Sequence, residues 1–543
     1  MRLSRGVVDQ LAAGGIDTVF GIPGKQTLPL NEAIANRGDI RFLVARHETA
    51  VSHEAWGYAE TSGDPAATVV VPGPGDMNAL NGLKNAANDC TPLVHIAVET
   101  EPEVRGGDGI HETPPETYDP VLKANLLVER PAATRIEVQR AIDTATTPPK
   151  GPVRVGIPKN FLGQDRPLAE PAGNPAQTDT SVSEDDIRAA AACLEDATRP
   201  VILVGGGARA AGATDELLAV ADTLDAPLGT TYKGKGVVSD RNERVAGTLS
   251  GSASPELVDC LAKSDVLLAV GTDFDGVATR HWSVEMPDDI VQITLSPGDL
   301  GTGYDLSVGI VADAAAALSA LDGELPDIDG GGIERATVVQ DATRERIDPL
   351  LDDNPPLTSV RALRAVRSAL PEETIVSVDA GGFRVWALNT FDACGPRSYV
   401  NPGSWATMGT GLPAALGAQV ANPDENVVAL SGDGGLMMCI HELHTAASEN
   451  IPVTLVVFNN SDYAIISEEA ERSFGLDGYD WADAGLDFTT IAAGMDVEAA
   501  RAATPAEIET ELTAALESDE PRVVEIPTDP EEPQASEWMD EST

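Results

Sequence analysis

Buried strands that run directly into glycine turns recur along the whole chain, and this repeat restricts the fold more than any other feature. Examples are "ATVVVPGPG" from Ala67, "VILVGGG" from Val201 and "NVVALSGDGG" from Asn426. Segments with helical patterns separate these strands. Fully apolar strands alternating with helices are typical of parallel sheets with crossover helices. The sequence therefore predicts an α/β protein built from doubly wound parallel sheets.

The length and two linker-like segments divide the chain into three predicted domains. A chain of 543 residues suggests about three domains of ~150 residues. The segments "DRPLAEPAGNPAQTDTSVSE" and "GELPDIDGGGIERA" have little periodic apolar pattern and are predicted to be linkers. We expect domains at 1–165, 185–325 and 356–530. The acidic end, "DPEEPQASEWMDEST", is predicted to be disordered.

The charge of the chain excludes some classes of partner. Its 87 acidic and 36 basic residues give a formal net charge of −51. Such a field repels nucleic acid and anionic membranes and indicates a solvated, halophilic type of surface. No stretch approaches the ~20 apolar residues of a membrane span, and the N-terminus has no apolar signal core. The five scattered cysteines suggest neither a disulfide framework nor a zinc site. A cytoplasmic protein is expected.

The stretch Ser431–Asn460 combines a glycine turn with two adjacent amides. Asp433 follows one predicted strand, and Asn459 and Asn460 end the next. Ligands of open parallel sheets gather at the carboxyl ends of the strands, so these side chains should meet at one edge. Carboxylate and amide oxygens suit Mg²⁺ or Ca²⁺, and a magnesium ion held there could bind a diphosphate. The alternative is an ordinary strand–turn–helix with asparagines in a turn.

This spacing resembles a known signature. Gly-Asp-Gly followed, after 24 residues, by Asn-Asn resembles the signature of thiamine-diphosphate-dependent enzymes. The resemblance implies that Asp433, Asn460 and the backbone carbonyl of Asp462 bind Mg²⁺. Glycines can bring backbone N–H groups close to the diphosphate. The glycines expected to do so in this turn are Gly432, Gly434 and Gly435.

A second motif is "RHETA", followed by "AWGYAETSG". It is similar to the segment that carries the catalytic glutamate of this family, which implies that Glu48 lies beside N1′ of the aminopyrimidine. There it would promote the imino tautomer, which is acid–base catalysis relayed through the cofactor. The alternative is a surface glutamate after a strand.

The segment "WATMGTGLPAALGAQVA" resembles the part of acetolactate-synthase-like enzymes that grips the aminopyrimidine. By this resemblance Met408 wedges under the cofactor, and the Ala406 carbonyl accepts a hydrogen bond from the 4′-amino group. The alternative for Met408 is a core methionine before a helix. "VDAGG" matches a diphosphate-contacting strand end more loosely, with Gly381 and Gly382 as candidates.

The order of the motifs narrows the resemblance. Glu48 lies in the first domain and Asp433 in the third, as in the group of acetolactate synthase, pyruvate oxidase and pyruvate decarboxylase. This order implies an N-terminal pyrimidine-binding domain, a central Rossmann-like domain and a C-terminal diphosphate-binding domain. It also implies a homodimer or homotetramer with active sites between subunits, acting on a small 2-oxoacid.

The substrate side departs from acetolactate synthase. Lys25 replaces a small residue, Val98-Glu99 replaces Gly-Gln, and a "GMVxQW" run is missing. Lys25 could meet an anionic substrate group or face solvent. Glu99 is a further candidate active-site residue, and His111 could transfer protons or be structural.

The expected function is thiamine-diphosphate- and Mg²⁺-dependent decarboxylation of a 2-oxoacid with carboligation, and the alternative is an aldehyde-forming decarboxylase. The turn "VGGGARAAGA" leaves FAD binding, and with it a thiamine/FAD oxidoreductase, as a further alternative. However, "VGTDFDGVATR" lacks the arginine expected near a flavin. The "HELH" run, His441–His444, does not match HExxH, so no metal role is expected for it.

Overall fold

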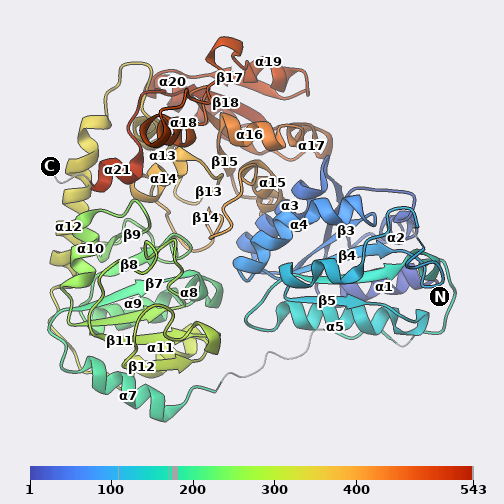
Figure 1. Ribbon diagram of the computed structural model, residues 1–543, viewed down its shortest axis with the longest axis horizontal. Helices are drawn as coiled ribbons and strands as arrows, with labels where there is room; N and C mark the ends of the chain where they lie inside the picture. Colours follow the sequence, from blue (N-terminus) through green and yellow to red (C-terminus); the bar gives the residue numbers. More distant parts are fainter. Residues whose placement is uncertain (108, 169, 174–180, 541–543) are drawn as a thin grey trace.

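Three six-stranded sheets form the structure, which is a computed structural model describing residues 1–107, 109–168, 170–173 and 181–540. Every ladder between neighbouring strands is parallel, and helices connect the strands (Figure 1). The predicted α/β fold of doubly wound parallel sheets is confirmed. The N-terminal sheet lies on the right of Figure 1, the central sheet below on the left and the C-terminal sheet at the top.

The N-terminal sheet has the strand order β2-β1-β3-β4-β6-β5. Its strands are β1 Thr18–Gly21, β2 Arg41–Val44, β3 Ala66–Val70, β4 Leu93–Glu99, β5 Ala124–Leu127 and β6 Val153–Pro158. Its helices are α1 Leu3–Ala13, α2 Leu28–Ala35, α3 Glu48–Ser62, α4 Pro74–Asn88, α5 Thr134–Thr146 and α6 Lys159–Leu162.

The central sheet has the order β12-β11-β10-β7-β8-β9. Its strands are β7 Pro200–Val204, β8 Leu228–Thr231, β9 Val245–Leu249, β10 Val266–Val270, β11 Asp289–Thr294 and β12 Val308–Val311. Its helices are α7 Glu184–Leu194, α8 Gly206–Ala211, α9 Thr214–Thr223, α10 Pro255–Ala262 and α11 Ala314–Asp322. Helix α12, Gly332–Ile347, then leads to the third sheet.

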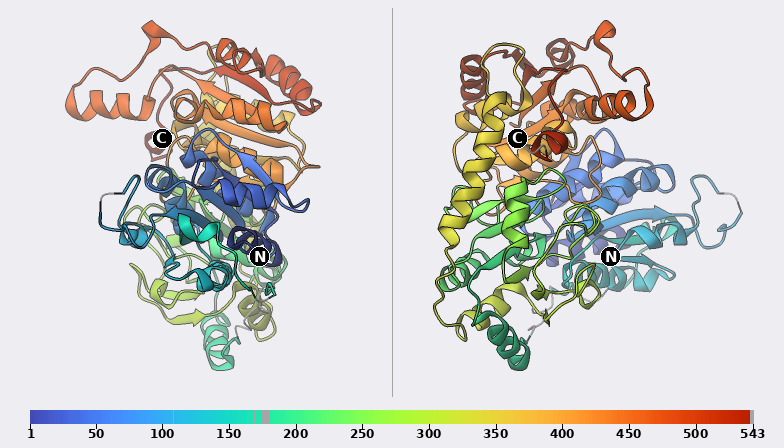
Figure 2. Two further views of the ribbon diagram at one scale, coloured as in Figure 1. Left: turned by 90° about the vertical axis from the view of Figure 1, so that its right-hand side faces the viewer. Right: turned by 60° about the vertical axis from the view of Figure 1, so that its left-hand side comes forward.

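The C-terminal sheet has the order β14-β13-β15-β16-β18-β17. Its strands are β13 Ile375–Val378, β14 Tyr399–Val400, β15 Val427–Gly432, β16 Thr454–Asn459, β17 Glu498–Arg501 and β18 Arg522–Pro527. Its helices are α13 Ser359–Ala369, α14 Gly382–Thr390, α15 Gly411–Ala421, α16 Asp433–Cys439, α17 Glu442–Glu449, α18 Ala464–Glu469, α19 Phe488–Ala493, α20 Pro505–Leu516 and α21 Ala535–Asp540. Helix α18 projects from this part of the molecule (Figure 2).

Two segments expected to be irregular are helical. The last residues of the second predicted linker begin α12, because Ala336 and Val339 supply an apolar face that packs beside the central sheet. The end of the chain, predicted to be disordered, forms α21 up to Asp540. Its Ala535 and Met539 are buried in the C-terminal core, so two well-placed apolar residues overcome the acidic composition. Part of the first predicted linker, 174–180, lies outside the described residues.

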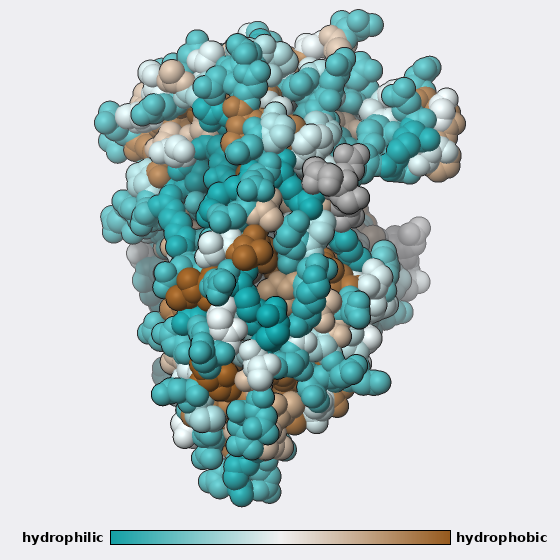
Figure 3. All heavy atoms as spheres, turned by 90° about the vertical axis from the view of Figure 1, so that its left-hand side faces the viewer, coloured by the Kyte–Doolittle hydropathy of each residue, from teal (hydrophilic) through white to brown (hydrophobic). Residues whose placement is uncertain are grey.

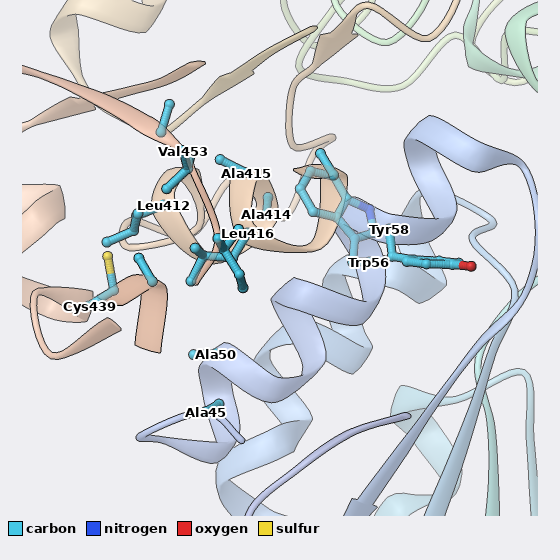
Figure 4. Packing of buried hydrophobic residues seen from close by; sticks show 14 of the residues in the cluster. Ala45, Ala50, Trp56, Tyr58, Leu412, Ala414, Ala415, Leu416, Cys439 and Val453 are labelled. Atoms are coloured by element: carbon cyan, nitrogen blue, oxygen red, sulfur yellow. The ribbon is translucent and has the colours of Figure 1, made fainter. Parts of the chain in front are cut away.

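Helices α3 and α15 join the N-terminal and C-terminal sheets along an intimate contact (Figure 4). A Cβ atom on Gly57 would lie 2.1 Å from the carbonyl oxygen of Ala414, and one on Gly417 would lie 1.8 Å from that of Glu54. Only glycine allows two helix backbones to approach this closely. Alanines of both helices, with Val51, Trp56 and Tyr58 of α3 and the leucines of α15, fill the remaining space and form one core with both sheets.

A buried ion cluster joins all three sheets. Lys233, after β8, donates to Glu60 of α3 at 3.0 Å, to Asp89 at 3.0 Å and to the carbonyl of Asn401 at 3.1 Å. Arg209 of α8 also donates to Glu60. Paired buried charges of this kind fix the geometry in which domains meet, since an unpaired partner would remain desolvated.

The face shown in Figure 3 is mostly hydrophilic, with small separate hydrophobic patches. None of the helices in the described part of the chain is both long and apolar enough to cross a bilayer. All five cysteines are free thiols.

The α3–α15 contact predicts the effect of one small substitution. Gly57→Ala should lower the free energy of unfolding by about 1–3 kcal/mol, because overpacking forces the helices apart. Gly38→Ala is the matched control: nothing lies within 4 Å of its Cβ position, so a change within about 0.5 kcal/mol is expected. Equal melting temperatures of the two variants would contradict the close approach.

Candidate active site

The strand order of the C-terminal sheet reverses between β13 and β15, and an aspartate follows each of these strands. Strand order proceeds outward from β13 on one side and from β15 on the other. Ligands of open α/β sheets bind at such a switch point, beyond the carboxyl ends of the strands. Asp379 follows β13, and Asp433 follows β15. Both side chains are buried, with 0% and 3% exposure.

Asp433 is a buried carboxylate whose described contacts include no basic side chain. Its Oδ1 accepts the N–H of Gly434 at 2.7 Å, and its Oδ2 accepts the N–H of Ser461 at 2.6 Å. Burial raises the pKa of Asp433 to about 6, and the two backbone hydrogen bonds limit the rise. The second bond ties the end of β15 to the loop after β16. A cation beside this carboxylate would offset its desolvation.

The two adjacent asparagines have different surroundings. Asn459 is buried, and its amide donates to Glu525 at 2.8 Å. Asn460 is half-buried, and its Oδ1 accepts the N–H of Asp462 at 3.2 Å. Ser461, between Asn460 and Asp462, has a φ of 59°, in the left-handed region. The turn thus brings Asn460 and Asp462 to the same loop that bonds Asp433, as the spacing in the sequence predicts.

Asp379 is a site residue that the motifs did not reveal. Its carboxylate accepts the Ser431 hydroxyl at 2.8 Å and the N–H groups of Ala380, Gly409 and Thr410 at 2.8, 2.9 and 3.1 Å. Burial raises the pKa of Asp379 to about 6, and these hydrogen bonds oppose the rise. Asp379 therefore holds the segment after Met408 against the switch point. Its position after a buried strand, like that of Asp433, was the available signal in the sequence.

The glycines of the turn are required by close neighbours. A Cβ on Gly434 would lie 2.5 Å from the Tyr463 ring and 3.4 Å from Cε of Met408. A Cβ on Gly435 would lie 2.7 Å from Asp379. Gly432 precedes them as the N-cap of α16. Met408 therefore lies beside the turn that carries Asp433. It is half-buried and does not belong to the hydrophobic core.

Two further expected residues have unusual backbone conformations. Ala406 adopts φ 42°, a left-handed conformation that is unfavourable for alanine. Such local strain is characteristic of functional sites. Gly381 is the N-cap of α14 at φ 152°, and Gly382 is the first residue of that helix. Gly381 and Gly382 therefore follow Asp379 at the same switch point.

Glu48 is the first residue of α3 and is half-buried. Its Oε2 accepts the amide of Asn78 at 3.0 Å, and a Cβ on Gly75 would lie 3.0 Å from its Oε1. One turn along α4, Asn81 donates to Thr407 at 3.2 Å and accepts from Trp405 at 2.7 Å. Helix α4 therefore contacts both the glutamate and the segment of Ala406 and Met408.

Lys25 and His111 lie on exposed loops around the start of α4. Lys25 adjoins Gly24, whose Cβ position is 2.2 Å from Val71, and Val71 leads into α4. His111 has φ 63°, and its carbonyl lies 2.5 Å from the Cβ position of Gly73. The structure thus brings both loops to the same edge of the N-terminal sheet as Glu48.

Glu99 belongs to a buried ion cluster. Arg154 donates to Glu99 and, at 2.6 Å, to Asp76, which also bonds His95 at 3.0 Å. Burial raises the pKa of Glu99, while Arg154 opposes the rise. Burial also acts on Asp76, but His95 and Arg154 outweigh it and lower the pKa of Asp76 to about 2. Of this cluster only Glu99 is predicted from the sequence, since its members come from three separate segments.

The glycine turn "VGGGARAAGA" and the possible metal-binding groups are two weaker features of the sequence. In the central sheet, Cβ atoms on Gly205 and Gly207 would lie 2.3 and 2.8 Å from Gly271, so the glycine turn packs closely against backbone. No group of three or more His, Cys, Asp or Glu able to hold a metal occurs among the described residues. The set at Asp433 differs from such groups, since it pairs one carboxylate with an amide and a carbonyl.

Comparisons with known proteins cover nearly the whole chain. Three thiamine pyrophosphate enzyme family models match: the N-terminal TPP binding domain at 1–119, the central domain at 187–321 and the C-terminal TPP binding domain at 379–526. A "Probable acetolactate synthase large subunit" of Methanocaldococcus jannaschii is 30% identical over 98% of this chain and 93% of the relative.

Two further matches agree. The acetolactate synthase isozyme 1 large subunit of Escherichia coli is 29% identical over 97% of this chain and 94% of its own. An X-ray structure of a Mycobacterium smegmatis protein, described as thiamin diphosphate-dependent, shares the fold. Its TM-score is 0.82 at 23% identity, and the match covers 97% of this chain and 99% of the other. The chain therefore belongs to the thiamine pyrophosphate enzymes, as an acetolactate synthase-like member of that family.

Proposed function

We propose that this protein uses thiamine diphosphate and Mg²⁺ to decarboxylate a 2-oxoacid and join the product to a second carbonyl compound. The observation that carries the proposal is the buried Asp433 at the switch point. Its carboxylate faces the Asn460 loop and has no basic partner among its described contacts. The relatives named acetolactate synthase support the reaction class.

The metal ligands are Asp433, Asn460 and the carbonyl of Asp462. The residues present fit a hard cation, because a desolvated carboxylate gains from a nearby positive charge and all three groups offer oxygen. Asn459 is not assigned this role, because it is buried, its amide nitrogen donates to Glu525 and its Oδ1 accepts the N–H of Ser461 at 3.1 Å. The ion would attach the diphosphate to the ends of β15 and β16.

The glycines at the starts of α14 and α16 bind the diphosphate. Tyr463 and Asp379 leave no room for a side chain at Gly434 and Gly435, and glycine lets backbone N–H groups approach a phosphate closely. The other contributors are Gly381, Gly382 and Gly432.

Ala406 and Met408 bind the aminopyrimidine. Ala406 has a left-handed backbone conformation, and its carbonyl would accept a hydrogen bond from the 4′-amino group. Met408, beside Gly434, would pack under the cofactor. When bound, thiamine diphosphate supplies the electron sink that decarboxylation requires.

Glu48 exchanges a proton with N1′ of the aminopyrimidine. Asn78 orients its carboxylate. We place this glutamate in the active site of a companion subunit, so that a homodimer is the minimum unit and a homotetramer the alternative. Exposed apolar side chains on α4, on α16 and before α15 support such an interface. These are Met77 at 45%, Trp405 at 44%, Met437 at 40% and Met438 at 51% exposure.

Lys25 and His111 face the substrate. Both lie on exposed loops near α4, where the lysine can pair with the carboxylate of a 2-oxoacid and the imidazole can transfer a proton. Glu99 remains a prediction, and in the structure Arg154 donates to its carboxylate. FAD also remains an untested alternative, for which a flavin absorbance spectrum of the purified protein is decisive.

The product distinguishes the proposed reaction from its alternative. Incubation with pyruvate, thiamine diphosphate and Mg²⁺ should yield acetolactate, measured by chromatography, and EDTA should abolish it. Acetaldehyde as the sole product would support the simple decarboxylase instead. Absence of turnover would call for a panel of other 2-oxoacids.

Glu48→Gln should lower kcat by at least about 100-fold, because an amide cannot exchange a proton with N1′. Circular dichroism and calorimetric affinity for thiamine diphosphate should stay close to those of the unchanged protein. Full activity in this variant would refute the acid–base role of Glu48.

The two asparagines provide a matched pair. Asn460→Ala should weaken Mg²⁺-dependent binding of thiamine diphosphate by about 10- to 100-fold in calorimetry, since a ligand is lost. Asn459→Ala should instead lower the melting temperature, because Glu525 would lose its buried partner. Reversed behaviour of the pair would contradict the assignment of the metal ligand.

A further inference from the structure

Helix α17 packs against the segment of chain that leads into Glu48. This helix begins within "HELH", His441–His444, which was not expected to bind a metal. Its side chains instead contact residues 44–47, between the end of β2 and the start of α3. Segments almost 400 residues apart in sequence thus meet directly before the proposed catalytic glutamate.

Glu442 makes the central contact. Its side chain is fully buried, at 0% exposure. Both carboxylate oxygens lie 3.1 Å from the backbone nitrogen of Arg46, and Oε1 also accepts the N–H of His47 at 3.0 Å. Thr445 donates its hydroxyl to the same carboxylate. Charge-assisted bonds from backbone N–H groups to a buried carboxylate are strong and directional.

Other residues of α17 hold the same segment from the side. Arg46 donates through Nε to His444 Nδ1 at 2.8 Å and through Nη2 to the Ser448 hydroxyl at 2.5 Å. Glu449 accepts the N–H of Val44 at 3.3 Å. These contacts follow one face of the helix, so α17 binds the segment along its length.

The bonds from Glu442 act on the two peptides immediately before Glu48. His47 is the N-cap of α3, and its ring accepts the N–H of Thr49 at 3.2 Å. Because Glu442 binds the N–H groups of Arg46 and His47, the two peptides before Glu48 are held in one orientation. The Glu48 side chain itself makes one described hydrogen bond, to Asn78, so its aim depends on the backbone that carries it.

We propose that Glu442 is a positioning residue: it aims the Glu48 carboxyl at the aminopyrimidine by holding the two N–H groups before it. This inference rests on the proposed acid–base role of Glu48. Glu442 lies nine residues after Asp433 on consecutive helices. The segment from Asp433 to Glu442 therefore supplies a metal ligand of one proposed site and holds the glutamate that acts in the site of the companion subunit.

Hydrogen exchange in the cofactor-free protein tests the contact itself. Glu442→Ala should raise the amide exchange rate of Arg46 and His47 by at least about tenfold, because their N–H groups lose a buried acceptor. Glu442→Gln should give a smaller change, since its amide oxygen still accepts. Glu509→Gln, on the surface of α20, removes the same charge and should change neither rate. Unaltered exchange in Glu442→Ala would overturn the inference.

Deuterium exchange at C2 of bound thiamine tests the positioning. In Glu442→Ala loaded with thiamine diphosphate and Mg²⁺, this rate and kcat should fall at least about tenfold, while cofactor affinity and KM stay within about twofold. Unchanged C2 exchange would assign Glu442 a purely structural role and overturn the inference alone. Unchanged C2 exchange in Glu48→Gln would overturn the proposed function with it. If Glu442→Ala fails to fold, Glu442→Gln answers both tests.

Discussion

The close approach of α3 and α15 is the contact on which the rest of the structure depends. Gly57 and Gly417 remove the side chains that would separate the two helices. As a result, a helix that begins at Glu48 lies directly beside one that follows Met408. The carboxyl edges of the N-terminal and C-terminal sheets, each with its own residues of the proposed site, are thereby fixed relative to one another.

Buried carboxylates of this protein serve three different purposes, which depend on their partners. Glu60 and Asp89 are neutralised by Lys233, and Asp76 by Arg154, so they hold domains and loops together. Asp379 and Glu442 accept backbone N–H groups and shape the segments beside the site. Among the described residues Asp433 bonds backbone N–H groups and no basic side chain, which leaves it suited to a cation.

Prediction from sequence succeeded where the signal was local. Strands β13, β15 and β16 and the residues after them follow from apolar runs ending in Gly, Asp or Asn. The buried helix at the end of the chain was missed because the acidic composition obscured two apolar residues, Ala535 and Met539. The surroundings of Glu99 were missed because Asp76, His95 and Arg154 come from separate segments.

The sequence by itself determined the doubly wound sheets, because strand and helix periods and glycine turns act over a few residues. It also determined which residues stand at strand ends, among them Asp433 and Asn460. Only the tertiary structure decided that Asn459 is buried and donates to Glu525, while Asn460 is half-buried and accepts the N–H of Asp462. It likewise placed Glu442 against the backbone before Glu48. Such pairings depend on the packing of whole sheets and helices, and no local pattern in the chain encodes them.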